Sequence, residues 1–150
     1  MGSDSHSRDT QPPVTPAVLA EHSRFVQRIR RRYADERALL PPGLPRRDAV
    51  TELVAALRGR GRALASALRV ARHLVLERLA VLDIEQGCAM EDVTLAMTEL
   101  AEATLDLALA QAIADQAARH GVPRNEAGGD IEFWVIGMGK LGARELNVSS

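Results

Sequence analysis

The sequence predicts a mainly α fold: a helical bundle that leads into the strand-turn-helix start of an α/β domain. Hydrophobic residues make up 46% of the 150 residues, but aromatic residues only 3%. The core is therefore built from Leu, Ala and Val, which suits helices better than sheets. Apolar residues recur at helical spacing through residues 15–123, and after residue 124 the pattern changes to a short β-rich run followed by glycines.

These patterns divide the chain into three regions. Residues 1–14 are polar with almost nothing to bury, and we expect a disordered tail. Residues 15–123 are expected to form the helical region. Residues 124–150 are expected to form the incomplete start of a second domain.

The first expected helix has Thr15 as its N-cap and Pro16 at its first helical position. It runs to about Leu39, because the proline-rich residues 41–45 cannot continue a helix. Those prolines also predict a stiff linker to the next helix.

The second expected helix starts at a cap on Asp48, and its apolar residues follow the spacing of one buried face. These residues are Val50, Leu53, Val54 and Leu57. A break is expected at Gly59 and Gly61, each of which costs roughly 1 kcal/mol relative to Ala in a helix. A third helix covers residues 62–84.

The fourth expected helix is long and runs from Met90 to Arg119. Acidic residues in its first turn favour the positive end of the helix dipole. Residues 120–123, His-Gly-Val-Pro, are a stop signal. His73, His120 and Cys88 have no second ligand at metal spacing, so we interpret them as core or surface residues.

The charge distribution, the cysteine content and the apolar runs indicate where the protein is located and which partners it can have. The net charge is −1, but residues 1–80 carry 15 Arg and 8 acidic residues, whereas residues 81–150 carry 4 basic and 12 acidic residues. One cysteine forms no internal disulfide, and no apolar run reaches the ~18–20 residues of a membrane span. A cytoplasmic protein without a membrane partner is expected.

The basic part of the chain allows one non-catalytic alternative, a helical interaction module that docks a partner on a basic surface spanning residues 24–72. No aromatic or RNA-binding signature accompanies these arginines, so a nucleic-acid partner is not expected.

The strongest motif lies at the end of the chain. Residues 131–136 predict a strand, Gly137-Met138-Gly139 a glycine turn, and residues 140–147 a helix. Glycines let the backbone approach a ligand, and the start of a helix attracts anions. Lys140 is the only lysine in the chain, and its flexible charge suits a phosphate.

Three interpretations of this motif remain open from the residues alone. The first interpretation is a purely structural turn that packs a strand against a helix. The second takes Gly137-x-Gly139-x-x-Gly142 as the fingerprint of a Rossmann NAD(P)-binding domain. The third interpretation is a family resemblance. Residues 137–150, Gly-Met-Gly-Lys-Leu-Gly-Ala-Arg-Glu-Leu-Asn-Val-Ser-Ser, resemble a motif of the bifunctional glutamine synthetase adenylyltransferase/adenylyl-removing enzymes. The family pattern is Gly-x-Gly-Lys-Leu-Gly-x-x-Glu-Leu-x-x-Ser-Ser, and every fixed letter is present.

The resemblance implies that the second domain is a nucleotidyltransferase palm. It implies phosphate or nucleotide binding by five residues, namely Gly137, Gly139, Lys140, Ser149 and Ser150. The motif is similar to that of the N-terminal half of the family, which removes adenylyl groups from a tyrosine of glutamine synthetase by phosphorolysis to ADP. Glutamine synthetase and a PII signalling protein are the implied partners, and Mg²⁺ with ATP, ADP or phosphate the implied cofactors.

In that family an Asp-x-Asp pair follows the two serines and holds the metal. These 150 residues contain no such pair, so we expect no catalytic or metal-binding residue within them, no tight cofactor binding and no activity of the chain alone. We also expect weak hydrogen-exchange protection at Val135 and Ile136, because an isolated strand is marginal in water.

Overall fold

The computed structural model describes residues 19–148 and is mainly helical, as the composition predicts. The elements are η1 (Ala20–His22), α1 (Arg24–Arg32), η2 (Arg37–Leu39), α2 (Arg47–Gly59), α3 (Leu64–Gln86), α4 (Met90–His120) and α5 (Gly139–Gly142). None of these described helices is long and apolar enough to cross a membrane. The tail predicted at residues 1–14 and the cap predicted at Thr15–Pro16 lie outside the described residues.

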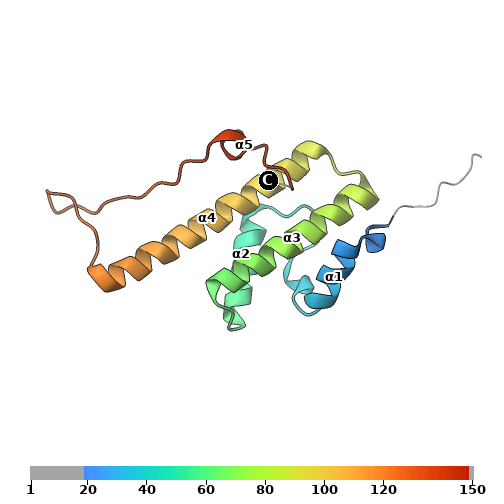
Figure 1. Cartoon of the computed structure of the whole chain (residues 1–150), viewed down its shortest axis with the longest axis horizontal. Helices are drawn as coiled ribbons and strands as arrows, with labels where there is room; N and C mark the ends of the chain where they lie inside the picture. The colour runs from blue at the N-terminus through green and yellow to red at the C-terminus, as the bar shows by residue number, and fades with distance from the viewer. Residues whose placement is uncertain (1–18, 149–150) are drawn as a thin grey trace, which may run out of the picture.

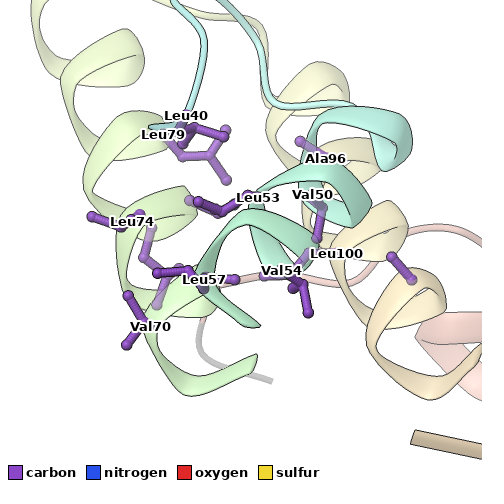
Figure 2. Packing of buried hydrophobic residues seen from close by; sticks show 14 of the residues in the cluster. Leu40, Val50, Leu53, Val54, Leu57, Val70, Leu74, Leu79, Ala96 and Leu100 are labelled. Atoms are coloured by element: carbon purple, nitrogen blue, oxygen red, sulfur yellow. The ribbon is translucent and has the colours of Figure 1, made fainter. Parts of the chain in front are cut away.

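Helices α1 to α4 form a bundle in which α3 packs against each of the other three (Figure 1). Leu53 and Leu57 of α2 are completely buried, and in Figure 2 they lie on the side of α2 that faces α3. Val50 lies on the side that faces α4. The apolar face predicted for α2 is thus confirmed, because each of its four residues is at most 1% exposed.

The first helix differs from its prediction, since the chain breaks it into η1, α1 and η2. Ser23 caps α1, and its hydroxyl accepts the N–H of Val26 at 3.5 Å. At the other end Tyr33 leaves helical geometry, and its buried ring contacts His73 of α3. A local cap and a tertiary contact therefore outweigh the continuous apolar pattern.

The cap predicted at Asp48 is also wrong, because Arg46 is the N-cap residue of α2. Asp48 lies in the first turn instead, where its carboxylate still meets the positive end of the helix dipole. The predicted break after α2 is confirmed, with Gly61 at φ +85°.

Helix α3 ends at Gly87, whose φ of +61° is the left-handed conformation that glycine adopts without strain. Helix α4 begins at Met90 as predicted and continues well beyond the bundle (Figure 1). Its buried residues end at Ala103, so its C-terminal part is largely open to solvent.

The strand predicted at residues 131–136 does not form among the described residues. This stretch is extended and returns along α4 (Figure 1), but its one ladder contact is an isolated bridge between Arg124 and Asp130. A strand needs a neighbour for its backbone N–H and C=O groups, and no described segment supplies one. Trp134 and Ile136 are accordingly 80% and 83% exposed.

Candidate functional site

The glycine turn at residues 137–142 is the candidate site, and its backbone geometry accounts for two of its glycines. Gly139 has φ +56°, which is unfavourable for residues with a Cβ. At Gly142 a Cβ would lie 2.5 Å from the carbonyl oxygen of Gly137. The turn thus requires glycine at both positions for its own shape, whether or not a ligand binds there.

The helix predicted at residues 140–147 is much shorter in the structure, where α5 covers only Gly139–Gly142. Arg144 then adopts φ +60°, a left-handed conformation that ends the helix. The N–H of Glu145 donates to the carbonyl oxygen of Lys140 at 2.8 Å and closes the turn.

Lys140 is exposed, and no described residue forms an ion pair with its ammonium group. Its charge is therefore available to an anion that approaches the turn from solvent. Gly137, Gly139 and Lys140 lie on this turn, whereas Ser149 and Ser150 lie outside the described residues.

Arg144 attaches the turn to the helical bundle, and nothing in the sequence analysis predicted this role. Its guanidinium lies 3.4 Å from Glu102 Oε2 and 3.7 Å from Glu99 Oε1, both on α4. Arg144 thus combines a left-handed backbone, which shapes the turn, with a side chain that pairs with two carboxylates of α4.

A second attachment is a buried hydroxyl. Thr98 of α4 is completely buried, and its Oγ1 accepts the N–H of Leu146 at 3.2 Å. The same hydroxyl donates to the carbonyl oxygen of Thr94 at 2.9 Å. Thr98 lies within the apolar face of α4, and a polar residue at that position is the sequence signal that would have identified it.

Acidic residues of α4 and arginines of α2 complete the surroundings of the turn. The backbone N–H of Arg47 donates to Glu99 Oε2 at 2.9 Å, and its guanidinium pairs with Asp106. A cavity of about 280 Å³ lies between these groups and the turn. Because its guanidinium and carboxylate groups already pair with one another, the cavity carries little uncompensated charge.

The metal that the resemblance implies finds no fitting donor set in the part of the chain that the structure describes. No group of three or more His, Cys, Asp or Glu residues there is arranged to hold a metal ion. Glu99, Glu102 and Asp106 share one face of α4 but are engaged by arginines. These carboxylates are therefore assigned to ion pairs and not to a metal.

His73 and Cys88 lie away from the turn. The ring of His73 stacks on Tyr33, and burial, followed by the charges of Arg72, Arg32 and Arg28, lowers its pKa from 6.5. The pKa of the Cys88 thiol is raised, first by burial and then by nearby carboxylates. Such a thiol is less readily ionised and is a weak nucleophile.

Comparison with known proteins gives one consistent result. Residues 10–150 match the family model described as glutamate-ammonia ligase adenylyltransferase. The match includes the glycine turn, so the interpretation of this turn as the start of a Rossmann domain loses its support. No solved structure matches the chain.

Curated relatives agree with the family model, and each is named bifunctional glutamine synthetase adenylyltransferase/adenylyl-removing enzyme. The relative from Aromatoleum aromaticum is 35% identical over 154 residues, which cover 94% of this chain and 16% of the relative. The relative from Chromobacterium violaceum is 36% identical over 148 residues, or 93% and 16%. The relative from Ralstonia nicotianae is 44% identical over 89 residues, or 59% and 9%. The chain thus spans less than a fifth of the length of these relatives.

Proposed function

This chain belongs to the glutamate-ammonia ligase adenylyltransferase family, and we propose that it supplies the helical lead-in and the phosphate-binding turn of an adenylyl-removing nucleotidyltransferase. The observation that carries the proposal is the complete Gly-x-Gly-Lys-Leu-Gly-x-x-Glu-Leu-x-x-Ser-Ser pattern at residues 137–150. The names of the relatives support glutamine synthetase as the protein substrate.

The proposed reaction is phosphorolysis of adenylyl-tyrosine. An oxygen of inorganic phosphate attacks the phosphorus of the adenylyl group, the bond from that phosphorus to the tyrosine oxygen breaks, and a new P–O–P linkage gives ADP. The tyrosine oxygen takes up a proton. Negative charge increases on the phosphate oxygens as the reaction proceeds, so a positioned cation accelerates it.

In this proposal Lys140 is that cation, with Ser149 and Ser150 as further contacts to the phosphate or nucleotide. Gly137 and Gly139 let the backbone approach the anion. The support within the structure is the exposed, unpaired ammonium group of Lys140 on a turn that glycines shape.

The contacts with α4 give the turn a fixed position, which the proposal requires. Catalysis by a positioned charge depends on geometry, and small displacements reduce the rate strongly. The ion pairs of Arg144 and the hydrogen bond from Leu146 to Thr98 attach the chain to α4 shortly after the last glycine of the turn. The helical region thus serves as the base on which the turn rests.

The remaining parts of the proposal concern the whole protein and its setting. We propose regulation by a PII signalling protein, a cytoplasmic location, and Mg²⁺ with ATP, ADP or phosphate as cofactors. Residues 124–150 are proposed to join a nucleotidyltransferase palm, in which the extended stretch at 131–136 gains the strand neighbours it lacks among the described residues.

A chimera tests the proposal directly. The aligned stretch of the Chromobacterium violaceum relative is replaced by these 150 residues, and ADP release is measured from adenylylated glutamine synthetase and phosphate. We expect activity in the chimera and a loss of about a hundredfold in Lys140→Ala, the size typical of one transition-state contact. For the 150-residue chain alone we expect no ADP.

The matched control is Arg119→Ala, which removes another exposed cation from the last turn of α4. It is expected to leave ADP release unchanged. Equal rates for the chimera with and without Lys140 would remove this residue from the site. An active chimera that only adds AMP to glutamine synthetase would instead assign the turn to the opposite reaction.

A further inference from the structure

Four exposed arginines lie on one side of the bundle, remote from the glycine turn in sequence. Arg28 and Arg32 come from α1, and Arg69 and Arg72 come from α3. We refer to these four residues as the arginine face. The two helices that carry them pack against each other (Figure 1).

Three observations place the members of the arginine face near one another. Arg28, Arg32 and Arg72 all act electrostatically on the single imidazole of His73. The guanidinium of Arg28 lies 5.9 Å from the ring centre of Phe25, and Phe25 lines one groove together with Arg72. Arg69 and Arg72 line a second groove.

The arginine face has no carboxylate partners among the described residues, and this distinguishes it from several other described arginines. Six arginines of the described residues besides Arg124 have carboxylate partners: Arg30, Arg37, Arg46, Arg47, Arg62 and Arg144. No member of the arginine face has one within the described chain. The whole chain has nearly as many acidic residues as basic ones. The excess of positive charge at the arginine face therefore arises from where the charged residues lie and not from the overall composition.

Two apolar grooves adjoin this charge, and Arg72 lines both. One has a volume of about 520 Å³ and includes Phe25, Leu76 and Leu79, with Asp83 as the carboxylate in its lining. The other has a volume of about 400 Å³ and includes Leu68, Met97 and Leu100. The surface therefore combines fixed positive charge with space for apolar side chains.

We propose that the arginine face binds an acidic amphipathic protein segment, with its carboxylates on the arginines and its apolar side chains in the two grooves. Guanidinium groups match carboxylates through paired N–H donors. An amphipathic helix that places apolar residues into a groove is a common mode of peptide recognition. The proposal does not depend on the proposed phosphorolysis.

A nucleic acid fits this surface less well than an acidic peptide. Single strands bind through bases that stack on exposed aromatic rings. The one aromatic side chain in the grooves, Phe25, is half-buried and lies beneath Arg28. Phosphates also offer no apolar groups for the grooves.

The test uses the full chain and a fluorescent helical peptide of about five turns, with Leu along one face and Glu on both sides of it. Binding is followed by anisotropy at low salt. We expect binding that weakens as salt rises. We expect the triple variant Arg28→Gln/Arg69→Gln/Arg72→Gln to raise the dissociation constant about tenfold, since it removes three exposed ion pairs that each contribute modestly to binding.

A matched triple variant, Arg58→Gln/Arg119→Gln/Arg124→Gln, removes the same charge elsewhere and should bind normally. Replacing the peptide's Leu by Ser should abolish binding if the grooves take part. The ring signals of His73, followed by NMR, should titrate at higher pH with the peptide bound, because carboxylates offset the arginines around it.

Three results would overturn the proposal: no binding of the Glu–Leu peptide at low salt, an equal loss in both triple variants, or tighter binding of a single-stranded oligonucleotide of equal charge. The last would identify the face as a nucleic-acid site instead.

Discussion

The helical bundle and the segment at residues 121–148 are held in place by different forces. In the bundle, Leu53, Leu57 and Val75 have no exposed surface at all. In the segment, Trp134, Ile136 and Met138 are 80–83% exposed, and one buried hydrogen bond and two ion pairs join its end to α4. The bundle has its own core, whereas the segment is joined to it by a few polar contacts and by the partly buried Leu146, which packs against that core.

The difference bears on function, because the residues of the candidate site all come from the weakly held region. A site on such a segment is positioned by its attachments rather than by burial. Variants that differ in how deeply the changed side chain is buried, or in which region it holds, can separate stabilisation by the core from stabilisation by the attachments.

The largest effect is expected from Leu53→Ala. Truncating a completely buried leucine loses its burial and leaves a cavity, so the free energy of unfolding should fall by about 2–5 kcal/mol. Urea denaturation of the purified chain measures the change. Ile136→Ala, on a side chain that is 83% exposed, should change it by less than about 0.5 kcal/mol. Comparable losses would show that residues 131–136 are packed.

A smaller effect is expected from Glu77→Gln. Glu77 is 4% exposed, and its carboxylate lies 2.6 Å from Arg30 and 3.7 Å from Arg37. Removing its charge leaves both arginines without their partner, which should cost about 1–3 kcal/mol. Urea denaturation again gives the value.

The matched change is Asp106→Asn, which breaks the ion pair with Arg47 on the surface of α4. Both side chains are about half exposed, so the loss should stay below about 1 kcal/mol. If both variants lose equal stability, burial does not distinguish these pairs.

The same contrast explains which features were predictable from the sequence. The spacing of Val50, Leu53, Val54 and Leu57 predicted a buried face because helix packing follows a local period. The first helix was predicted too long, because the contact between Tyr33 and His73 joins residues 40 positions apart. No local pattern records such a contact.

The candidate site was predictable in part for a similar reason. Gly137, Gly139 and Lys140 were proposed as site residues because their motif is contiguous, and their binding of a phosphate stays a prediction. Arg144 and Thr98 were missed, since their partners lie 42 and 48 residues away along the chain. The strand was predicted from the apolar residues at 131–136, but β propensity depends on a neighbouring strand, and the described residues contain none.

Thr98→Val tests the attachment of the segment itself. Valine keeps the volume but removes the hydroxyl that accepts the N–H of Leu146. We expect amide exchange at Leu146 to accelerate several-fold, with a change in global stability of about 1 kcal/mol. Hydrogen exchange followed by NMR measures both. The control is Thr94→Val, which removes a hydroxyl bonded only within α4 and should leave exchange at Leu146 unchanged. Unchanged exchange in Thr98→Val would mean that the ion pairs of Arg144 and the packing of Leu146 suffice.

The smallest effect concerns pH and the bundle's contact between His73 and Tyr33. The Tyr33 hydroxyl and the Nδ1 of His73 lie 3.1 Å apart and share a hydrogen bond, in which the hydroxyl donates when Nδ1 carries no proton. Burial and the charges of Arg72, Arg32 and Arg28 lower the pKa of His73 below its ordinary 6.5. Below that pH the unfolded chain therefore takes up the proton more readily than the folded chain, and stability falls until the folded-state pKa is passed.

Urea midpoints at about pH 7.5 and pH 5 measure this loss in the native chain and in His73→Gln. Other groups also titrate in this range, so the informative quantity is the difference between the two proteins. Glutamine cannot take up the proton, and His73→Gln should lose less stability on acidification. His120→Gln, on an exposed histidine at the end of α4, should lose as much as the native chain. An identical pH dependence in all three proteins would mean that neither burial nor the arginines around His73 lower its pKa. The support from His73 for the arginine face would then be lost, and that proposal would rest on the ion pairs and grooves alone.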